Sequence, residues 1–248
     1  MVDEEIASQT GLTLSGERGL TTRSSRLARR GLELVAPTTE AVPRCCVDEV
    51  NDAVLAQLRG DRPTILHLFR KKITDACLVH VARLTVLEAL DLGRTQVTDA
   101  GLRHLTGLSA LKWLDCGATQ VTDAGLLHLA GLRRLEELCL KGTRVADSGL
   151  ACLQGLTCLK KLDLSGTRVT DAGLVHLHGL TGLQELCLPF KISDARLPDL
   201  VGRLQQLPSL RQLSFPGSDE GPLDSEEEER WAVLRRALPE CRLLVSLL

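Results

Sequence analysis

The sequence predicts an α/β solenoid, a curved stack of repeats with a parallel sheet on its concave side and short helices on its convex side. A unit of 24 residues recurs in register, starting at Leu87, Leu111, Leu135 and Leu159. Each unit opens with LxxLxL, whose alternation is typical of a short strand with one buried face. It continues with a pattern close to TxVTDAGLxxLxxL, which is typical of a turn and a short helix. One unit cannot bury its own apolar face, whereas stacked units can.

Charge and composition argue against two classes of partner, nucleic acids and membranes. The 248 residues carry a formal net charge of −2, which gives no global signal for nucleic acid or an anionic membrane. Aromatic residues make up 2% of the chain and Tyr is absent, which is too few for a base-stacking surface. No apolar run approaches the roughly 20 residues that span a bilayer, and the acidic N-terminus lacks the apolar core of a secretion signal. We therefore expect neither a nucleic-acid nor a membrane partner.

The cysteines indicate a compartment. Their number, nine, is odd, and no small-domain disulfide framework surrounds them. We interpret them as free thiols in a reducing environment, several packed as small hydrophobic residues, so the expected location is cytoplasmic.

Two segments precede the regular repeats. Residues 1–43 lack a periodic pattern and are predicted to be a disordered or loosely ordered extension. An Arg- and Ser-rich stretch at 24–34 suits a short amphipathic helix or a transit peptide, although acidic residues 3–5 argue against the latter. Residues 44–62 change to helical spacing and are predicted to form an N-terminal capping helix over the first repeat.

Residues 63–215 contain the repeats, each with a turn and a helix start. The first copy, from Pro63, is degenerate; the copy from Leu183 lacks the Thr, and an irregular copy starts at Leu210. Glycines mark the turns after the strands, and the next Thr is expected to satisfy buried backbone groups through its hydroxyl. These residues are Gly93, Gly117, Gly142 and Gly166, and Thr95, Thr119, Thr143 and Thr167.

The helix starts follow. N-cap threonines at Thr98, Thr122 and Thr170 are each followed by an Asp in the first turn, where the helix dipole favours a negative charge. The Ala-Gly pair after each Asp is expected to allow close packing, and leucines such as Leu102 and Leu105 are expected to face the core.

Residues 216–248 are predicted to be an acidic loop, a helix and a C-terminal cap. The helix is expected to begin near Ser225, where Glu226–Glu229 suit its first turn. The acidic run is interpreted as this helix start, and a binding patch is the alternative. We expect Trp231, Leu234 and Leu238 to pack inward and the last residues to form an edge strand.

These repeats resemble leucine-rich repeats, in a 24-residue variant with TxVTDAGL on the convex side. They look like the arrays of planctomycete-type bacteria and are similar to the cysteine-containing repeats of eukaryotic F-box adaptors. The resemblance covers residues 63–248 and implies a solenoid that binds proteins. An F-box is not visible in residues 1–62, which a role as substrate-recognition adaptor in a degradation complex would need to dock a second protein.

Metal-ligand residue types recur on the outward strand positions. The position between the last two strand leucines reads His67, Asp91, Asp115, Cys139, Asp163, Cys187 and Ser214. A metal or catalytic cluster is one interpretation, but neighbouring strands hold such side chains about 4.8 Å apart, whereas a metal needs three or four converging ligands. A second column, His80, His104, His128 and His176, is explained by duplication. We expect no metal, no cofactor and no enzymatic activity, because no nucleophile–base set, phosphate loop or zinc spacing is present.

The predicted function is a non-catalytic, monomeric module that binds a protein or peptide on the concave face. Trp113 is the expected anchor because its position points into the concavity, and exposed Trp is enriched in binding hot spots. Phe69 and Phe190 are further candidates at strand ends. The mixed-charge residues expected around Trp113 are Glu88, Asp91, Arg94, Lys112, Asp115, Glu136, Glu137, Lys160, Lys161, Asp163 and Glu185.

Overall fold

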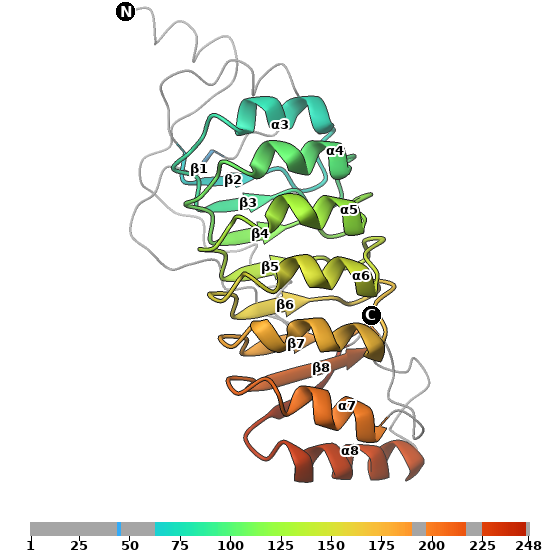
Figure 1. Cartoon of the computed structure of the whole chain (residues 1–248). Helices are drawn as coiled ribbons and strands as arrows, with labels where there is room; N and C mark the ends of the chain where they lie inside the picture. The colour runs from blue at the N-terminus through green and yellow to red at the C-terminus, as the bar shows by residue number, and fades with distance from the viewer. Residues whose placement is uncertain (1–43, 46–62, 190–196, 217–224, 247–248) are drawn as a thin grey trace, which may run out of the picture.

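The fold is an open parallel sheet with helices on one side. The computed structural model describes residues 44–45, 63–189, 197–216 and 225–246 (Figure 1). Within these residues, nine strands pair in chain order from β1 to β9, and all the pairs are parallel. The helices line the other side of the stack, as the sequence predicts for an α/β solenoid (Figure 1). No helix of the described residues has the length and apolarity needed to cross a membrane.

The elements are short and evenly spaced. The strands are β1 Arg44–Cys45, β2 Ile65–His67, β3 Ala89–Asp91, β4 Trp113–Asp115, β5 Glu137–Cys139, β6 Lys161–Asp163, β7 Glu185–Cys187, β8 Gln212–Pro216 and β9 Arg242–Ser246. The helices are α3 Asp75–Val81, α4 Asp99–Leu102, α5 Asp123–Leu126, α6 Asp147–Leu150, α7 Leu197–Leu204 and α8 Ser225–Ala237. Further 3-10 turns are η2 Arg103–Leu105, η3 Leu127–Leu129, η4 Ala151–Leu153 and η5 Asp171–Gly179.

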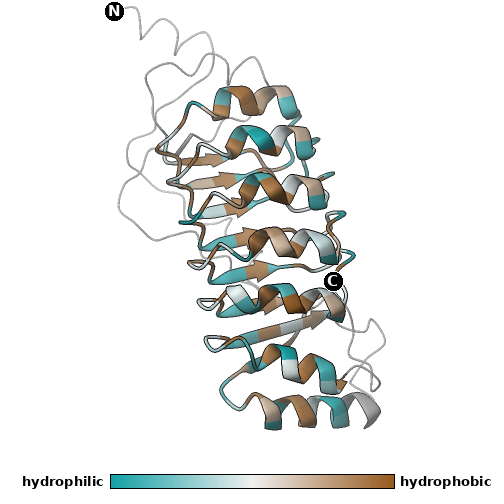
Figure 2. Cartoon of the chain, viewed as in Figure 1, coloured by the Kyte–Doolittle hydropathy of each residue, from teal (hydrophilic) through white to brown (hydrophobic). Residues whose placement is uncertain are grey.

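The core is one continuous column of leucines. From β2 to β8, the leucine at the second position of each strand pairs with its equivalent in the next strand, as in Leu90 with Leu114 and Leu114 with Leu138. These side chains point toward the helices and are at most 2% exposed. Hydrophobic and hydrophilic residues alternate along the helices and strands (Figure 2).

The turns confirm the predicted role of the threonines. Thr95 Oγ1 donates to the Leu92 carbonyl at 2.6 Å, and Thr119 and Thr143 make the equivalent bond to Cys116 and Leu140. All three threonines are buried. Because a buried carbonyl without a donor is costly, these hydroxyls stabilise the bend that follows each strand.

The helix starts are joined between repeats by a ladder of aspartates. Asp99 Oδ1 accepts from the Thr122 N–H at 2.7 Å, and its Oδ2 accepts from the Thr122 hydroxyl at 2.6 Å. The Thr122 hydroxyl in turn accepts from the Ala124 N–H, as predicted for an N-cap. The same rung joins Asp75 to Thr98 and Asp147 to Thr170. These aspartates therefore interact favourably with the helix dipole and also bond each repeat to the next.

One rung of this Asp–Thr ladder is built differently. Ala146 replaces the threonine, so Asp123 accepts from the Ala146 N–H at 2.6 Å and from the Ser148 hydroxyl two residues later. The carboxylate keeps both of its bonds although the hydroxyl has changed position.

The glycine of each VTDAGL motif is required by this ladder. A Cβ at Gly101, Gly125 or Gly173 would collide with the Asp carboxylate of the preceding repeat. At Gly149 it would lie 2.6 Å from Asp123 Oδ1. The close packing predicted for the Ala-Gly pair is thus confirmed, and its reason is the space that the carboxylate occupies.

The first two residues of the predicted N-terminal capping helix form a strand instead. A capping helix was predicted to begin at Arg44, but Arg44–Cys45 form β1 and pair with β2. The open edge of a sheet has unpaired N–H and C=O groups, which an extended segment can satisfy. The rest of that predicted helix and the extension over 1–43 lie outside the described residues, as do Phe190 and the acidic loop over 217–224.

The C-terminal end is closed largely as predicted. Strand β9 pairs with β8, and α8 begins at Ser225. Trp231 and Leu234 are buried, and Leu238 packs partly buried against the core. The Trp231 ring meets the edge of Phe215 with centroids 5.7 Å apart, which is a favourable aromatic geometry.

The turns after the strands contain a strained backbone position. Gly142 and Gly166 have φ of +67° there, whereas the equivalent residues Arg70, Arg94 and Ala118 have φ of 60°, 56° and 53°. The left-handed region favours glycine, so the three side chains carry a conformational cost.

Replacing Ala118 with Gly tests this cost. We expect Ala118→Gly to raise the free energy of unfolding by about 0.5–1 kcal/mol, because relief of strain exceeds the added entropy of the unfolded chain. The matched control is Ala130→Gly, at an exposed position with φ of −56°, where a loss of about 0.5–1 kcal/mol is expected. Urea unfolding measures both, and a loss at both positions would contradict the strain at Ala118.

The ladder is tested by removing one carboxylate. Asp99→Ala should cost about 2–3 kcal/mol, because it deprives the Thr122 N–H and hydroxyl of a charged acceptor. The control is Asp199→Ala in the first turn of α7, where Asp199 is exposed and only the dipole contribution of about 0.5 kcal/mol is lost.

A double-mutant cycle tests whether Gly125 is needed because it leaves space for the Asp99 carboxylate. Gly125→Ala alone should cost about 2 kcal/mol through the collision with Asp99. In the Asp99→Ala background that cost should fall by at least about 1 kcal/mol. Additive losses would show that Gly125 is required for another reason.

Candidate functional site

The candidate site is the sheet face, the side of the sheet opposite the helices and the predicted concave side. Two columns of side chains run across it, and the strand register aligns each of them. The first column is Ile65, Ala89, Trp113, Glu137, Lys161, Glu185 and Gln212. The second column is His67, Asp91, Asp115, Cys139, Asp163, Cys187 and Ser214.

Trp113 is half-buried and leans toward the N-terminal strands. Its ring meets the edge of the His67 ring with centroids 6.4 Å apart, although His67 lies two strands away. Ala89, on the strand between them, is only 3% exposed. Trp113 is therefore partly engaged within the molecule, and His67 is a partner that sequence reasoning did not connect with it.

Phe69 adds a second ring at this end of the sheet face. It is 45% exposed, and a Cβ at Gly93 would lie 2.9 Å from its ring, so Phe69 packs across that turn. The Arg70 guanidinium lies 5.8 Å from its ring centroid, within the range of a cation–π contact. We call His67, Phe69 and Trp113 the aromatic group.

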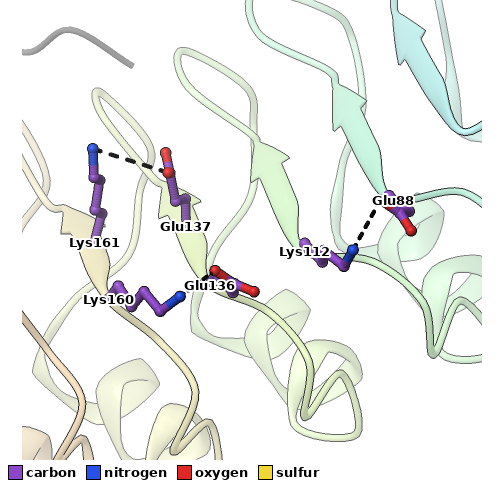
Figure 3. A network of polar contacts seen from close by, with 6 residues as sticks. All are labelled: Glu88, Lys112, Glu136, Glu137, Lys160 and Lys161. Atoms are coloured by element: carbon purple, nitrogen blue, oxygen red, sulfur yellow. Dashed lines mark hydrogen bonds and ion pairs between the residues drawn. The ribbon is translucent and has the colours of Figure 1, made fainter. Parts of the chain in front are cut away.

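The predicted charged residues are largely paired with each other. The Lys112 and Lys160 ammonium groups lie 3.0 Å and 2.6 Å from Glu88 and Glu136 of the preceding repeats (Figure 3). Lys161 lies between two carboxylates, 3.9 Å from Glu137 and 3.3 Å from Glu185. The structure thus brings together these seven charges of the predicted stripe. Arg94 lies apart from them, exposed in the turn after β3.

The aspartates of the second column hold the turns. Asp91, Asp115 and Asp163 each accept, through Oδ1, from the backbone N–H two residues later, at 3.0, 2.6 and 2.8 Å. Asp91 also lies 3.7 Å from His67 Nδ1. Within the described residues, no three His, Cys, Asp or Glu side chains are arranged to hold a metal ion. Three of the seven residues whose types suggest a metal site in the sequence therefore cap turns.

Burial also affects the ionisation of this column. Desolvation raises the pKa of the Asp115 carboxyl, the bond from the Gly117 N–H opposes that rise, and the charges of Asp91 and Asp163 add to it. The Cys139 and Cys187 thiols are buried, and desolvation raises their pKa, to about 12 for Cys187. A thiol with a raised pKa is a poor nucleophile and a poor metal ligand at neutral pH.

Glu137 is the least satisfied carboxylate of the first column. Desolvation raises its pKa, against the effect of the nearby Lys161. Its Oε2 atom is buried, with no hydrogen-bond partner among the described residues. A buried acceptor without a donor is a cost to the folded state.

The histidines of the helical side are half-exposed. His80, His104, His128 and His176 occupy the same position of four repeats. In the part of the chain that the structure describes, neighbouring copies are not joined to one another by a hydrogen bond.

Sequence reasoning missed a column of long polar side chains at the edge of the sheet face. Lys72, Gln96, Gln120, Arg144 and Arg168 occupy the same position of five successive turns, and all are exposed. Their 24-residue spacing is the signal that would have found them.

Comparison with known proteins agrees with this architecture. A family model described as "Leucine Rich repeat" matches residues 83–105 and 155–177. No curated protein matches the chain. Among solved structures, an internalin (InlF) of Listeria monocytogenes aligns with a TM-score of 0.54 and 22% identity, over 73% of this chain and 54% of that one. The chain therefore spans about half the length of that relative.

Two further structures are more distant in shape. Internalin C2 of Listeria monocytogenes is 26% identical, with a TM-score of 0.48, over 82% of this chain and 86% of that one. TLR13, solved in complex with ssRNA13, is 21% identical, with a TM-score of 0.49, over 73% of this chain and 28% of that one. The likeness to the first internalin concerns the fold alone, and the repeat subtype and the likeness to F-box adaptor repeats stay predictions.

The burial of Asp115 generates a pH-dependent prediction. Because the pKa of Asp115 is raised in the folded state, the folded state holds this proton more tightly than the unfolded state. The free energy of unfolding therefore falls as the pH rises above the ordinary pKa of an aspartate and Asp115 ionises. Asp115→Asn removes the charge and keeps an oxygen for the Gly117 N–H. We expect this variant to be more stable than the wild type at pH 7, with a gain that shrinks as pH falls toward the ordinary carboxyl range.

Thermal unfolding at several pH values measures the effect. The control Asp115→Ala also loses the acceptor and should be destabilised by about 1–2 kcal/mol at neutral pH. An Asn variant less stable than the wild type at pH 7 would show that the charge itself is needed.

Proposed function

Because this chain is a leucine-rich-repeat solenoid, we propose that it is a non-catalytic interaction module that binds a protein or peptide partner on its sheet face. The aromatic group carries this proposal. Phe69 is 45% exposed and Trp113 is half-buried on a surface that solvent reaches. Rings held in place by neighbours give a partner apolar contact at little entropic cost.

The paired charges suit a polar rim around that anchor. In the Lys112–Glu88 and Lys160–Glu136 pairs, the side chains remain 37–48% exposed. Such pairs contribute little to stability, so a partner can compete for either member at small cost. The charges also limit non-specific association, because an approaching like charge is repelled. The predicted stripe is therefore retained as a rim, with Trp113 as the anchor.

The proposal also covers the class of partner. A single-stranded nucleic acid would need a row of rings on which to stack, and Trp113 is the one aromatic residue of the first column. The proposed partner is accordingly a protein or peptide, and the module acts as a monomer. Its cytoplasmic location stays a prediction.

The test is a selection of displayed random peptides on the immobilised full chain. Clones enriched on the wild type should bind Trp113→Ala at least about tenfold more weakly, because the variant lacks the anchor ring. The control is Leu127→Ala, since Leu127 is 63% exposed on η3 of the helical side. A thermal melt of each variant confirms that it is folded.

Two results would overturn the proposal. Clones that bind both variants as well as the wild type would place the binding surface elsewhere. A wild-type chain that enriches no clone above background would argue against peptide recognition.

A further inference from the structure

The edge of the sheet face at the carboxyl ends of the strands has an unusual charge. The five turns after β2 to β6 cover residues 69–72, 93–96, 117–120, 141–144 and 165–168, and we call them the turn edge. They contain seven basic residues and no acidic residue, whereas the whole chain has a net charge of −2. Because salt screens charges beyond about 10 Å, a partner at this edge experiences the local cations rather than the net charge.

A column of hydrogen-bond donors runs along the turn edge. Its members are Lys72, Gln96, Gln120, Arg144 and Arg168, and we call them the donor column. Each is a long side chain that donates hydrogen bonds, and none carries a negative charge. The backbone fixes their spacing, because the N–H groups of Gln96, Gln120, Arg144 and Arg168 donate to the preceding repeat at 2.8–3.1 Å.

The donor column, with Arg94 and Lys141, differs from the lysines of the sheet face in forming no ion pair with a described residue. Lys112, Lys160 and Lys161 are instead paired with glutamates. The nearest carboxylates, those of Asp91, Asp115 and Asp163, each accept from a turn N–H. The side chains of the donor column are therefore available for an external acceptor.

Arg94 adds a further cation to this edge. It is exposed, in the turn that follows β3, at the position that Arg70 fills in the preceding turn.

We propose that the turn edge binds an extended acidic segment of the protein partner, with Arg94 and Lys141 beside the donor column. This inference rests on the proposed function and specifies the chemistry of the partner. Carboxylates accept from guanidinium, ammonium and amide groups alike, so every member of the column can take part.

The geometry of an extended chain fits this edge. Side chains on one side of an extended peptide recur about every 6.6 Å, and neighbouring repeats lie about 4.8 Å apart at the strands. Long, flexible side chains accommodate the difference, so the edge selects for a run of acidic residues rather than for one sequence. A peptide is favoured over nucleic acid because Phe69 is the single ring among these five turns.

The experiment measures binding of a fluorescein-labelled peptide of about eight glutamates to the full-length chain by fluorescence anisotropy at about 100 mM NaCl. Arg144→Glu with Arg168→Glu should weaken binding at least about tenfold, because two donors become repulsive charges. The matched control is Arg133→Glu with Arg134→Glu, an equal change at two exposed residues before β5, which should change the affinity less than about threefold.

The outcomes separate this inference from the proposed function. No binding of the glutamate peptide by the wild type, or equal losses in both double variants, would overturn the acidic-segment proposal. Library peptides that still depend on Trp113 would then leave the proposed function standing. Tighter binding of a single-stranded oligonucleotide or of anionic phosphatidylserine vesicles than of the peptide, lost in the Arg144/Arg168 variant, would also overturn it.

Discussion

From the first repeat to the one that starts at Leu159, each repeat is bonded to the next by a carboxylate that accepts hydrogen bonds from the helix start of its neighbour. The Asp–Thr ladder satisfies a backbone N–H, orients the hydroxyl that caps the following helix and places a charge at its positive end. The glycine after it is small because the carboxylate needs that space. The Asp of one VTDAGL motif therefore bonds to the Thr of the next, and the Gly of that next motif leaves space for the carboxylate. The short helices depend on this contact. Helices of four residues do not persist alone.

On the sheet face, too, most polar side chains bond to other parts of the chain. Its aspartates hold the turns, and its lysines and glutamates are paired across repeats. Residue types that suggest chemistry when read one at a time are used for structure when the repeats are stacked. The aromatic group is partly exposed, and the donor column forms no ion pair with a described residue, so these two places can contact a partner without breaking a bond of the fold.

Much of the fold was predictable because the repeats provide independent copies of one pattern. The leucine column, the buried threonines and the N-cap threonines follow from periodicity and local chemistry, and the structure confirms them. The cross-repeat role of Asp99 was not predictable, because it needs Thr122, 23 residues away, to be placed beside it. Strand β1 was also missed, since two residues that pair with a sheet edge leave no periodic signal. For the candidate site, the sequence predicted that Trp113 lies on the sheet face but not that its ring contacts His67, which depends on rotamers. The role of Trp113 as an anchor stays a prediction.

The altered rung at Ala146 has a consequence for how such a chain can grow or shrink. There the hydroxyl moves from one residue to another two positions on, and the carboxylate still bonds to both groups. The contact between two repeats thus requires a carboxylate acceptor in one repeat and a hydroxyl donor near the helix start of the next, rather than a donor at one fixed position. Recombination that adds or removes a whole unit would create a new neighbour pair able to reconnect in this way. The architecture is therefore adjustable in copy number, and with it the length of surface available to a ligand.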